Sequence, residues 1–314
     1  APNYGLNLDR LDIPVNPYDA FKCDVPNMST SLYFVVNDAF YKKALPKAEL
    51  PEGVFVGSLA DFSDHAAFGK VSAMYCQLAD DKDAITSLNT MLAQDALLIY
   101  FPKGVKVDRT LQVINILRSD VDLMVNRRVL IFLEDRADAR ILFCDHAADD
   151  RNFLTTQVVE VMVGDGAHLD MTCLEETHYK NVRVSNVYIH QQANSRVDHN
   201  VITLHNGVTR NRTDLVFSGE GAECYMNGCT IEDRQQHVDN NTLIDHRVPH
   251  CSSQELYKYV VDEQAVGAFA GRVLVRKDAQ KTASQMTNQN LCATKQARMF
   301  TQPMLEIYAD DVKC

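Results

Sequence analysis

Apolar and polar residues alternate along much of the chain after about residue 95. Leu169, Met171 and Cys173, for example, are separated by the polar residues Asp170 and Thr172. Successive side chains of a β-strand point to opposite faces, so a period of two predicts strands that bury one face. Short runs of this kind follow one another closely, and helical spacing largely disappears. The pattern predicts a mainly β architecture for residues 95–314.

The strand runs also resemble one another. Segments 129–144, 158–173 and 214–229 each lead from an apolar strand, through an acidic or glycine-containing turn and a small residue, into another strand. The small residue recurs at six positions, which are Ala137, Ala167, Ala193, Ala222, Ala265 and Ala297. The gaps between them are 30, 26, 29, 43 and 32 residues, and the longest is close to one and a half repeats.

A repeat of this length indicates a stacked architecture, because each unit must bury its apolar face against the next unit. The period-two alternation excludes a helical solenoid, because helical repeats need helical spacing. The blades of a β-propeller need longer units of about 40 residues. The sequence therefore predicts a parallel β-helix with one coil per repeat. A β-sandwich built from repetitive hairpins is the alternative.

Residues 1–94 mix strand and loop signals with helical ones. Segments 65–79 and 81–94 have the apolar spacing of helices, and Asp83 is a suitable helix start. In the second segment Ala84, Ile85, Leu88 and Leu92 are expected to share one face. We therefore predict a small mixed α/β N-terminal subdomain over residues 1–94 and a β-helix core over residues 95–314.

Composition and motifs exclude several classes of function. The net charge of −11 argues against nucleic acid as the partner, since phosphate binding needs a concentrated Lys/Arg surface. The sequence contains no run of eighteen apolar residues, so it predicts no membrane-spanning helix, and its first residues do not have the pattern of a secretory signal. Nine cysteines without a CxxC pair indicate free thiols in a reducing cytoplasm. Because GxxxxGK[ST], GxSxG and HExxH are absent, we expect a non-enzymatic protein.

The most specific motifs lie in the last part of the chain. They are Gly267-Ala268-Phe269-Ala270-Gly271, Gln280-Lys281-Thr282, the segment from Gln285 to Leu291, and a final strand from Leu305 to Cys314. Together with SLNT (87–90) and YFPKGV (100–105), these motifs resemble the SufB/SufD family. The C-terminal sequence LEIYADDVKC (305–314) is most similar to the SufD branch of that family. The resemblance covers most of the chain.

The resemblance implies a right-handed parallel β-helix that serves as a scaffold in the SUF iron–sulfur cluster assembly complex. The implied partners are a SufB-like subunit and a SufC-like ATPase, with a nascent cluster held transiently at the subunit junction and no tightly bound cofactor. The family's C-terminal helical segment, and a histidine that follows the lysine–cysteine pair, are expected beyond Cys314. We also expect the isolated chain to form a homodimer through its C-terminal β-helix region, because uncapped strand edges invite pairing.

Thiolates and imidazoles are the ligands that suit iron–sulfur chemistry. Cys314, at the end of the final strand, is the best-placed thiol for metal binding, and packing at an interface is its alternative role. His246, His250 and Cys251 have a spacing that a metal site tolerates, although structural hydrogen bonding is the favoured role for them.

Four other cysteines are expected to pack without chemistry. Alternation places Cys224 and Cys229 on opposite faces of a strand. Cys144 and Cys173 occupy matching places in the repeat and predict a stacked ladder in the core.

Two functions of other classes compete with the scaffold. The first is a β-helix carbohydrate-active enzyme, such as a polysaccharide lyase, with Asp233, Asp239 and Asp245 as its acidic cluster. The second is a purely structural homo-oligomer. His199 and His205 are expected on a solvated face and support neither alternative.

Overall fold

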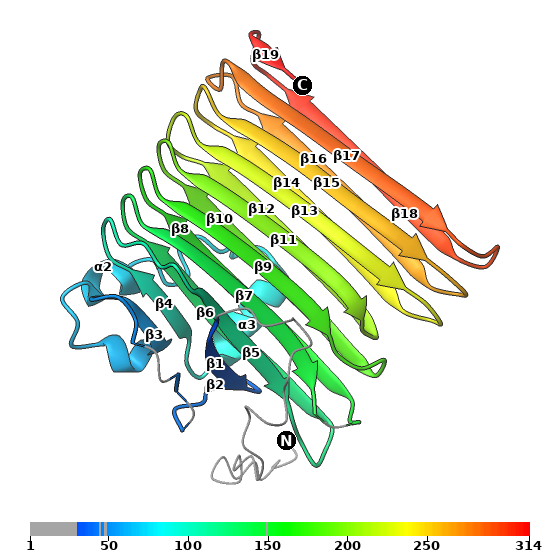
Figure 1. Cartoon of the computed structure of the whole chain (residues 1–314). Helices are drawn as coiled ribbons and strands as arrows, with labels where there is room; N and C mark the ends of the chain where they lie inside the picture. Colours follow the sequence, from blue (N-terminus) through cyan, green and yellow to red (C-terminus); the bar gives the residue numbers. More distant parts are fainter. Residues whose placement is uncertain (1–29, 44, 47–48, 149) are drawn as a thin grey trace.

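The computed structural model describes residues 30–43, 45–46, 49–148 and 150–314. Over this range the chain forms a parallel β-solenoid of about seven turns, with two sheets facing each other (Figure 1). From β4 onward, successive strands alternate between the sheets, and each strand pairs in parallel with the strand two places along the chain. The predicted mainly β, parallel β-helical fold is confirmed. The right-handed turn of its coils stays a prediction.

The two sheets are called sheet A and sheet B. Sheet A contains, in spatial order, β2 (Ala39–Phe40), β1 (Thr30–Val36), β5 (Thr110–Leu117), β7 (Asp138–Ala147), β9 (His168–Glu176), β11 (Arg196–His205), β13 (Glu223–Glu232), β15 (Ser252–Val261), β17 (Thr282–Cys292) and β19 (Val312–Lys313). Sheet B contains β3 (Phe55–Ser58), β4 (Leu97–Phe101), β6 (Leu123–Leu133), β8 (Phe153–Val163), β10 (Asn181–Gln191), β12 (Val208–Phe217), β14 (His237–His246), β16 (Val266–Val275) and β18 (Arg298–Ile307).

The space between the sheets, here called the lumen, holds the main core. Parallel register carries each lumen-facing side chain onto its equivalent in the next coil, as Leu169 stacks on Val197 and Val197 on Cys224. All three side chains are buried. The period-two pattern of the sequence therefore corresponds to one face in the lumen and one face outside.

A ladder of small buried residues closes the edge at which the chain passes from sheet B to sheet A. Its members are Ala137, Ala167, Ser195, Ala222, Cys251 and Thr282, each at most 1% exposed. From Ala137 to Cys251, each carbonyl accepts a hydrogen bond from the residue that follows the next member. A small side chain is needed here because the chain bends while facing the lumen.

The predicted alanine series follows this ladder only in part. Ala193 lies two residues before the true member, Ser195, at the tip of the turn. Ala265 and Ala297 belong to the opposite edge, where the chain returns from sheet A to sheet B. The gap of one and a half repeats thus marks a change from one edge to the other.

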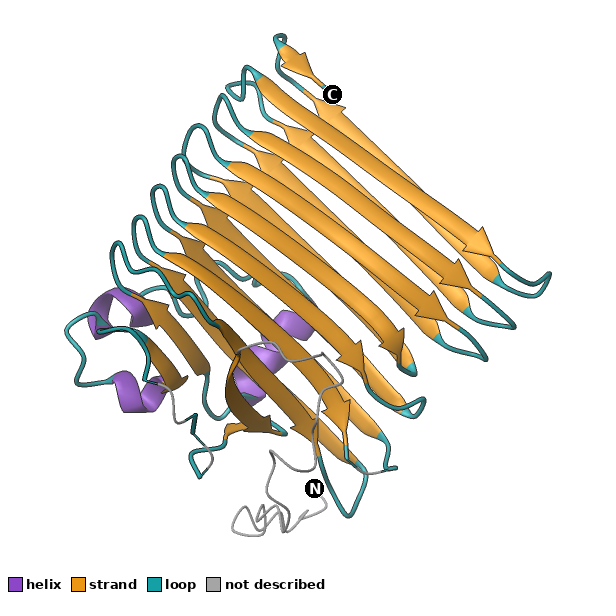
Figure 2. Cartoon of the chain, viewed as in Figure 1, coloured by secondary structure: helices purple, strands orange, loops and turns teal. Residues whose placement is uncertain are grey.

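The short helices lie at the N-terminal end of the solenoid, two beside β3 and β4 and one behind the strands (Figure 2). They are η2 (Leu59–Phe62), α2 (Phe68–Ser72) and α3 (Ala84–Leu92). The predicted helix over 65–79 is therefore confined mainly to the five residues of α2. None of the described helices is long and apolar enough to cross a bilayer.

Helix α3 begins at Asp83 as predicted, because the Asp83 carboxylate accepts a hydrogen bond from the backbone N–H of Thr86. The face it buries is different from the predicted one. Thr86 and Asn89 are the buried residues, with Thr86 Oγ1 2.8 Å from the Tyr188 hydroxyl and Asn89 Nδ2 donating to the Arg127 carbonyl. Side-chain hydrogen bonds to sheet B, rather than apolar packing, decide which face turns inward.

Candidate functional site

The C-terminal end of the solenoid exposes side chains that every earlier coil buries. Leu305 and Ile307 stack in register on Val273 and Val275, which are buried in the core. Leu305 is nevertheless 51% exposed and Ile307 is 41% exposed. Their row faces the lumen, and in the described part of the chain no further coil lies over it.

The backbone is equally open at this end. Within the described residues, β18 pairs only with β16, and the outer side of β17 pairs with β19 at Thr282 and Ala283 alone. Among these residues, the outer edges of both strands therefore carry backbone N–H and C=O groups that no strand pairs. We call the outer edges of β17 and β18, together with Leu305 and Ile307, the open end.

Cys314 lies at the rim of the open end. The predicted final strand from Leu305 to Cys314 is wrong, because β18 ends at Ile307 and the chain crosses to sheet A before β19. The pairing of Thr282 with Val312 and of Ala283 with Lys313 brings Cys314 beside Ser284. The thiol is exposed. Partial burial raises its pKa, and a hydrogen bond from the Ser284 backbone lowers it.

A chain of hydrogen bonds connects His246 with the neighbour of Cys314. His246 Nε2 lies 2.9 Å from Ser253 Oγ, and Ser253 Oγ lies 2.8 Å from Ser284 Oγ. His246 is fully buried, and burial lowers its pKa to about 4, so the imidazole is neutral at neutral pH. Sequence reasoning missed both serines. Their signal was a polar residue at the same lumen-facing position in consecutive coils.

The other two members of the predicted histidine and cysteine set lie apart from this chain. His250 is exposed in a turn, with a positive φ of 61°. Cys251 is buried in the small-residue ladder. Among the described residues, no three His, Cys, Asp or Glu side chains are arranged to hold a metal ion. Metal binding by His246, His250 and Cys251 stays a prediction.

The remaining cysteines divide by face. Cys224 is buried in the lumen and Cys229 lies on the opposite face, as alternation predicted, but the expected packing of Cys229 is wrong, because its side chain is exposed. The predicted ladder of Cys144 and Cys173 is wrong by one residue, because Cys173 pairs with Phe143 and Cys144 with Leu174. Cys23 lies outside the described residues.

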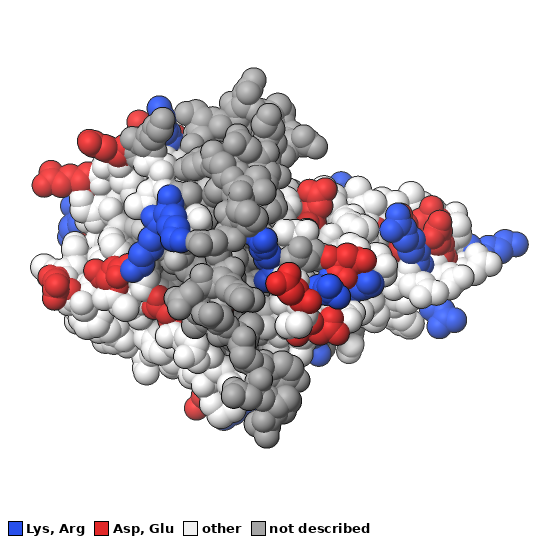
Figure 3. Space-filling view, turned by 90° about the horizontal axis from the view of Figure 1, so that it is seen from below, with Lys and Arg blue, Asp and Glu red and all other residues white. Residues whose placement is uncertain are grey.

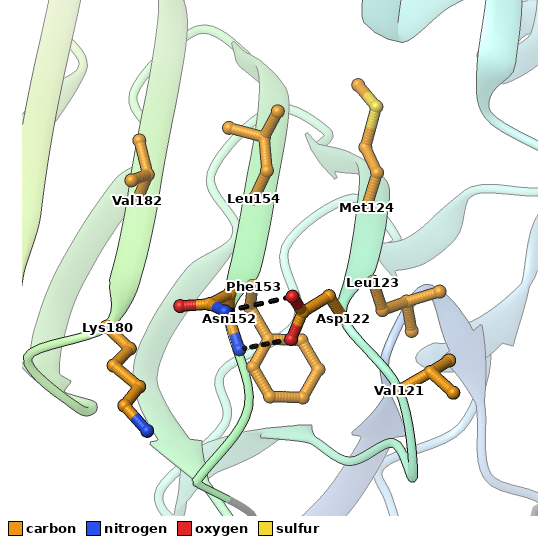
Figure 4. Close-up of a pocket in the computed structure, with 9 residues that line it drawn as sticks. All are labelled: Val121, Asp122, Leu123, Met124, Asn152, Phe153, Leu154, Lys180 and Val182. Atoms are coloured by element: carbon orange, nitrogen blue, oxygen red, sulfur yellow. Dashed lines mark hydrogen bonds between the residues drawn. The ribbon is translucent and has the colours of Figure 1, made fainter.

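An apolar groove of about 570 Å³ lies on the outer face of sheet B. Figure 4 shows the residues that line it. Met124, Leu154 and Val182 project side by side from consecutive coils, and Lys180 lies at the rim. The Asp122 carboxylate accepts two hydrogen bonds from Asn152 across the groove floor. The residues that line the groove include no pair of acids, no nucleophile and no cation besides Lys180, so they do not form a catalytic site.

Several charged groups on the surface form ion pairs. Acidic and basic side chains are interspersed on the face that Figure 3 presents. Of the three aspartates considered for a lyase, Asp245 bonds Arg247 and Arg276, and Asp239 lies 3.7 Å from Arg210. Asp233 lies in an exposed turn. These aspartates serve ion pairs and do not converge on one place.

The described residues form a parallel β-solenoid whose C-terminal coil, as far as Cys314, leaves two strand edges unpaired and carries a thiol. The chain belongs to the SufBD family. A family model described as "SUF system FeS cluster assembly, SufBD core domain" matches residues 116–314, and a second, "SufBD protein N-terminal region", matches residues 1–113. The predicted SufB/SufD membership is confirmed, and the description of the matching family model names the SUF system of iron–sulfur cluster assembly.

Curated relatives from three organisms agree with this placement. An iron–sulfur cluster assembly SufBD family protein of Synechocystis is 25% identical over 306 residues, which cover 92% of this chain and 66% of the relative. The iron–sulfur cluster assembly protein SufD of Escherichia coli is 28% identical over 276 residues, covering 84% and 64%. The chloroplastic protein ABCI7 of Arabidopsis thaliana is 25% identical over 293 residues, covering 89% and 60%. The chain thus spans less than two thirds of the length of these relatives.

Proposed function

We propose that this chain is a non-enzymatic scaffold subunit of the SUF complex, which pairs with a SufB-like subunit and works with a SufC-like ATPase in the cytoplasm. An iron–sulfur cluster is the cargo, and it forms transiently at the junction of the two solenoids. No tightly bound cofactor of the chain itself is part of the proposal.

The open end is the observation that carries the proposal. Unpaired strand edges are templates for pairing with another chain, and native proteins normally shorten, charge or cover them. Strands β17 and β18 are 11 and 10 residues long, and apart from β19 no described residue pairs with their outer edges. A solenoid of the same family would extend both sheets across the junction and bury Leu305 and Ile307.

The position of Cys314 supports the cluster part of the proposal. Iron is held by the thiolate, so metal binding must displace the proton of the thiol. Partial burial raises the pKa of the Cys314 thiol, and the backbone N–H of Ser284, which favours the thiolate, offsets part of that rise. A lone thiol cannot complete the shell of a cluster. We infer that the partner supplies the other ligands, which agrees with a site at the junction.

Co-expression of the affinity-tagged chain with SufB-like and SufC-like proteins from the same source tests the proposal. We expect both proteins to be retained, together with iron and acid-labile sulfide. The variant Cys314→Ser should retain both partners and lose iron and sulfide. Recovery of the tagged chain without either partner would refute the scaffold role, whereas unchanged iron in Cys314→Ser would refute only the role of that thiol.

A further inference from the structure

A small polar cavity lies inside the solenoid, among strands β7 and β9 to β12. The cavity has a volume of about 20 Å³ for the centre of a water-sized molecule. It is lined by Asp145, Cys173, Glu175, Arg183, Ser185, Val187, His199, Val201, Asn211 and Thr213. All of these residues except Cys173 are at most 8% exposed. The predicted solvated position of His199 is therefore wrong, because its side chain is fully buried in the lumen.

Two buried polar atoms of this lining have no hydrogen-bond partner, namely Arg183 Nε and His199 Nε2. The guanidinium of Arg183 is otherwise engaged, since Nη1 donates to Asn211 Oδ1 at 2.7 Å and Nη2 lies 3.2 Å from Asp145 Oδ2. A buried polar atom without a partner costs about 1–3 kcal/mol. Two residues that line the same cavity thus each carry a buried atom without a partner, which indicates that something occupies the cavity.

The protonation of His199 defines what that occupant must be. His199 Nδ1 lies 3.4 Å from the carbonyl oxygen of Met171, and a carbonyl can only accept, so Nδ1 carries the proton. Burial lowers the pKa of His199 to about 4, which keeps the ring neutral at neutral pH. Nε2 therefore presents a bare lone pair and needs a donor, while Arg183 Nε–H needs an acceptor.

We propose that this cavity binds one water molecule, which accepts a hydrogen bond from Arg183 Nε and donates one to His199 Nε2. A cavity needs about 10–15 Å³ of such space to hold a water, and buried waters typically make about three hydrogen bonds. The Cys173 thiol and the carboxylates of Asp145 and Glu175 line the same cavity and offer further partners.

Charged occupants do not fit this lining. A metal cation would meet the guanidinium of Arg183, and a bare anion would meet the His199 lone pair and two carboxyl groups. A neutral molecule that both donates and accepts satisfies the two orphan atoms together. The water then links polar groups of sheet A, on β9 and β11, with Arg183 of sheet B, on β10.

A crystal structure of the full chain at a resolution that reveals ordered waters tests the proposal. We expect one peak of water height within about 3.2 Å of both Arg183 Nε and His199 Nε2. An empty cavity would overturn the proposal. A peak of the height of sulfur, chloride or a metal ion would overturn it as well.

A solution measurement provides the matched comparison. Val201→Leu places an extra methylene in the cavity lining. Val197→Leu makes the same change on the same strand, at a lumen-facing residue that does not line the cavity. Water-oxygen magnetic relaxation dispersion counts long-lived buried waters. We expect the count to fall by one in Val201→Leu and to stay unchanged in Val197→Leu. An unchanged count in Val201→Leu, or an equal fall in both variants, would contradict the proposal.

Discussion

Arg128 and Glu160 form an ion pair that is sealed from solvent between the N-terminal region and sheet B. Arg128 Nη2 lies 2.5 Å from Glu160 Oε2, and both side chains are 0% exposed. Glu160 also accepts hydrogen bonds from the backbone N–H groups of Cys76, Leu78 and Ala79. One carboxylate therefore holds the loop after α2 against strands β6 and β8.

Replacing Glu160 by Gln should strongly destabilise the fold. The substitution leaves the Arg128 guanidinium buried without an opposite charge, which costs about 3–5 kcal/mol. Lys103→Met breaks an exposed pair with Asp135 and should cost less than about 1 kcal/mol. Urea unfolding of the two variants measures the difference. Equal losses of stability would show that the buried pair has no special role.

Two glycine-to-alanine substitutions should have opposite effects. A Cβ at Gly219 would lie 2.0 Å from the backbone nitrogen of Ala193, in the turn of the coil below, and backbone cannot move aside. A loss of about 1–3 kcal/mol or more is expected from such overpacking. Gly69 lies in α2, and a methyl group added there would meet nothing within 4 Å, so alanine should stabilise by about 0.5–1 kcal/mol. Thermal unfolding of both variants distinguishes the two directions.

The period-two pattern and the repeat were enough to predict the coils, because stacking requires the same few side chains at each lumen position. They did not fix the register. Ser195 replaces alanine in the small-residue ladder, so a search for alanine found Ala193, two residues away. Similarly, Cys144 and Cys173 differ by one residue in register and point to opposite faces. Composition cannot reveal a shift of one residue when both faces of a strand are buried.

The candidate site was predictable only as single residues. Cys314 and His246 were chosen for their chemistry, whereas the only signal of Ser253 and Ser284 is a polar residue at the same lumen-facing position of consecutive coils, which is recognisable once the register is known. Helix α3 shows the same limit, since its buried face consists of Thr86 and Asn89. Tertiary hydrogen bonds determined that face, and apolar periodicity does not report them.

Ser253 should contribute more to stability than its neighbour Ser252. Removing the Ser253 hydroxyl leaves His246 Nε2 buried without a partner, and His246 Nδ1 already has none. Ser253→Ala should therefore cost about 1–3 kcal/mol. Ser252 is half-buried and points away from the lumen, so Ser252→Ala should stay within about 0.5 kcal/mol of wild type. Chemical denaturation of both variants tests this difference, and equal effects would contradict the hydrogen-bonded chain.

Two buried glutamates should make stability depend on pH. Burial raises the pKa of Glu232 to about 8 and that of Glu255 to about 7, from an ordinary value of 4.5. The folded state holds these protons more tightly than the unfolded state. The stability that the two protonated carboxyl groups contribute is therefore fully present below about pH 4.5 and is lost as the pH rises to the pKa of the folded state. The slope is about 1.4 kcal/mol per pH unit for each group.

The matched variants separate the two glutamates. The unfolding free energy of Glu232→Gln minus that of wild type should increase from about pH 4.5 to about pH 8. For Glu255→Gln the same difference should increase only up to about pH 7. Denaturant titrations across this range provide the test. A difference that does not change with pH would show that neither carboxyl group titrates in the folded protein as described.

Light scattering of the isolated chain at micromolar concentration tests the open end most directly. We predict a homodimer for wild type and a monomer for Leu305→Glu. Ile231→Glu makes a comparable change at a residue 47% exposed on the outer face of sheet A, against 51% for Leu305, and should remain dimeric. A monomeric wild type, or a Leu305→Glu variant that dimerises as wild type does, would contradict the account.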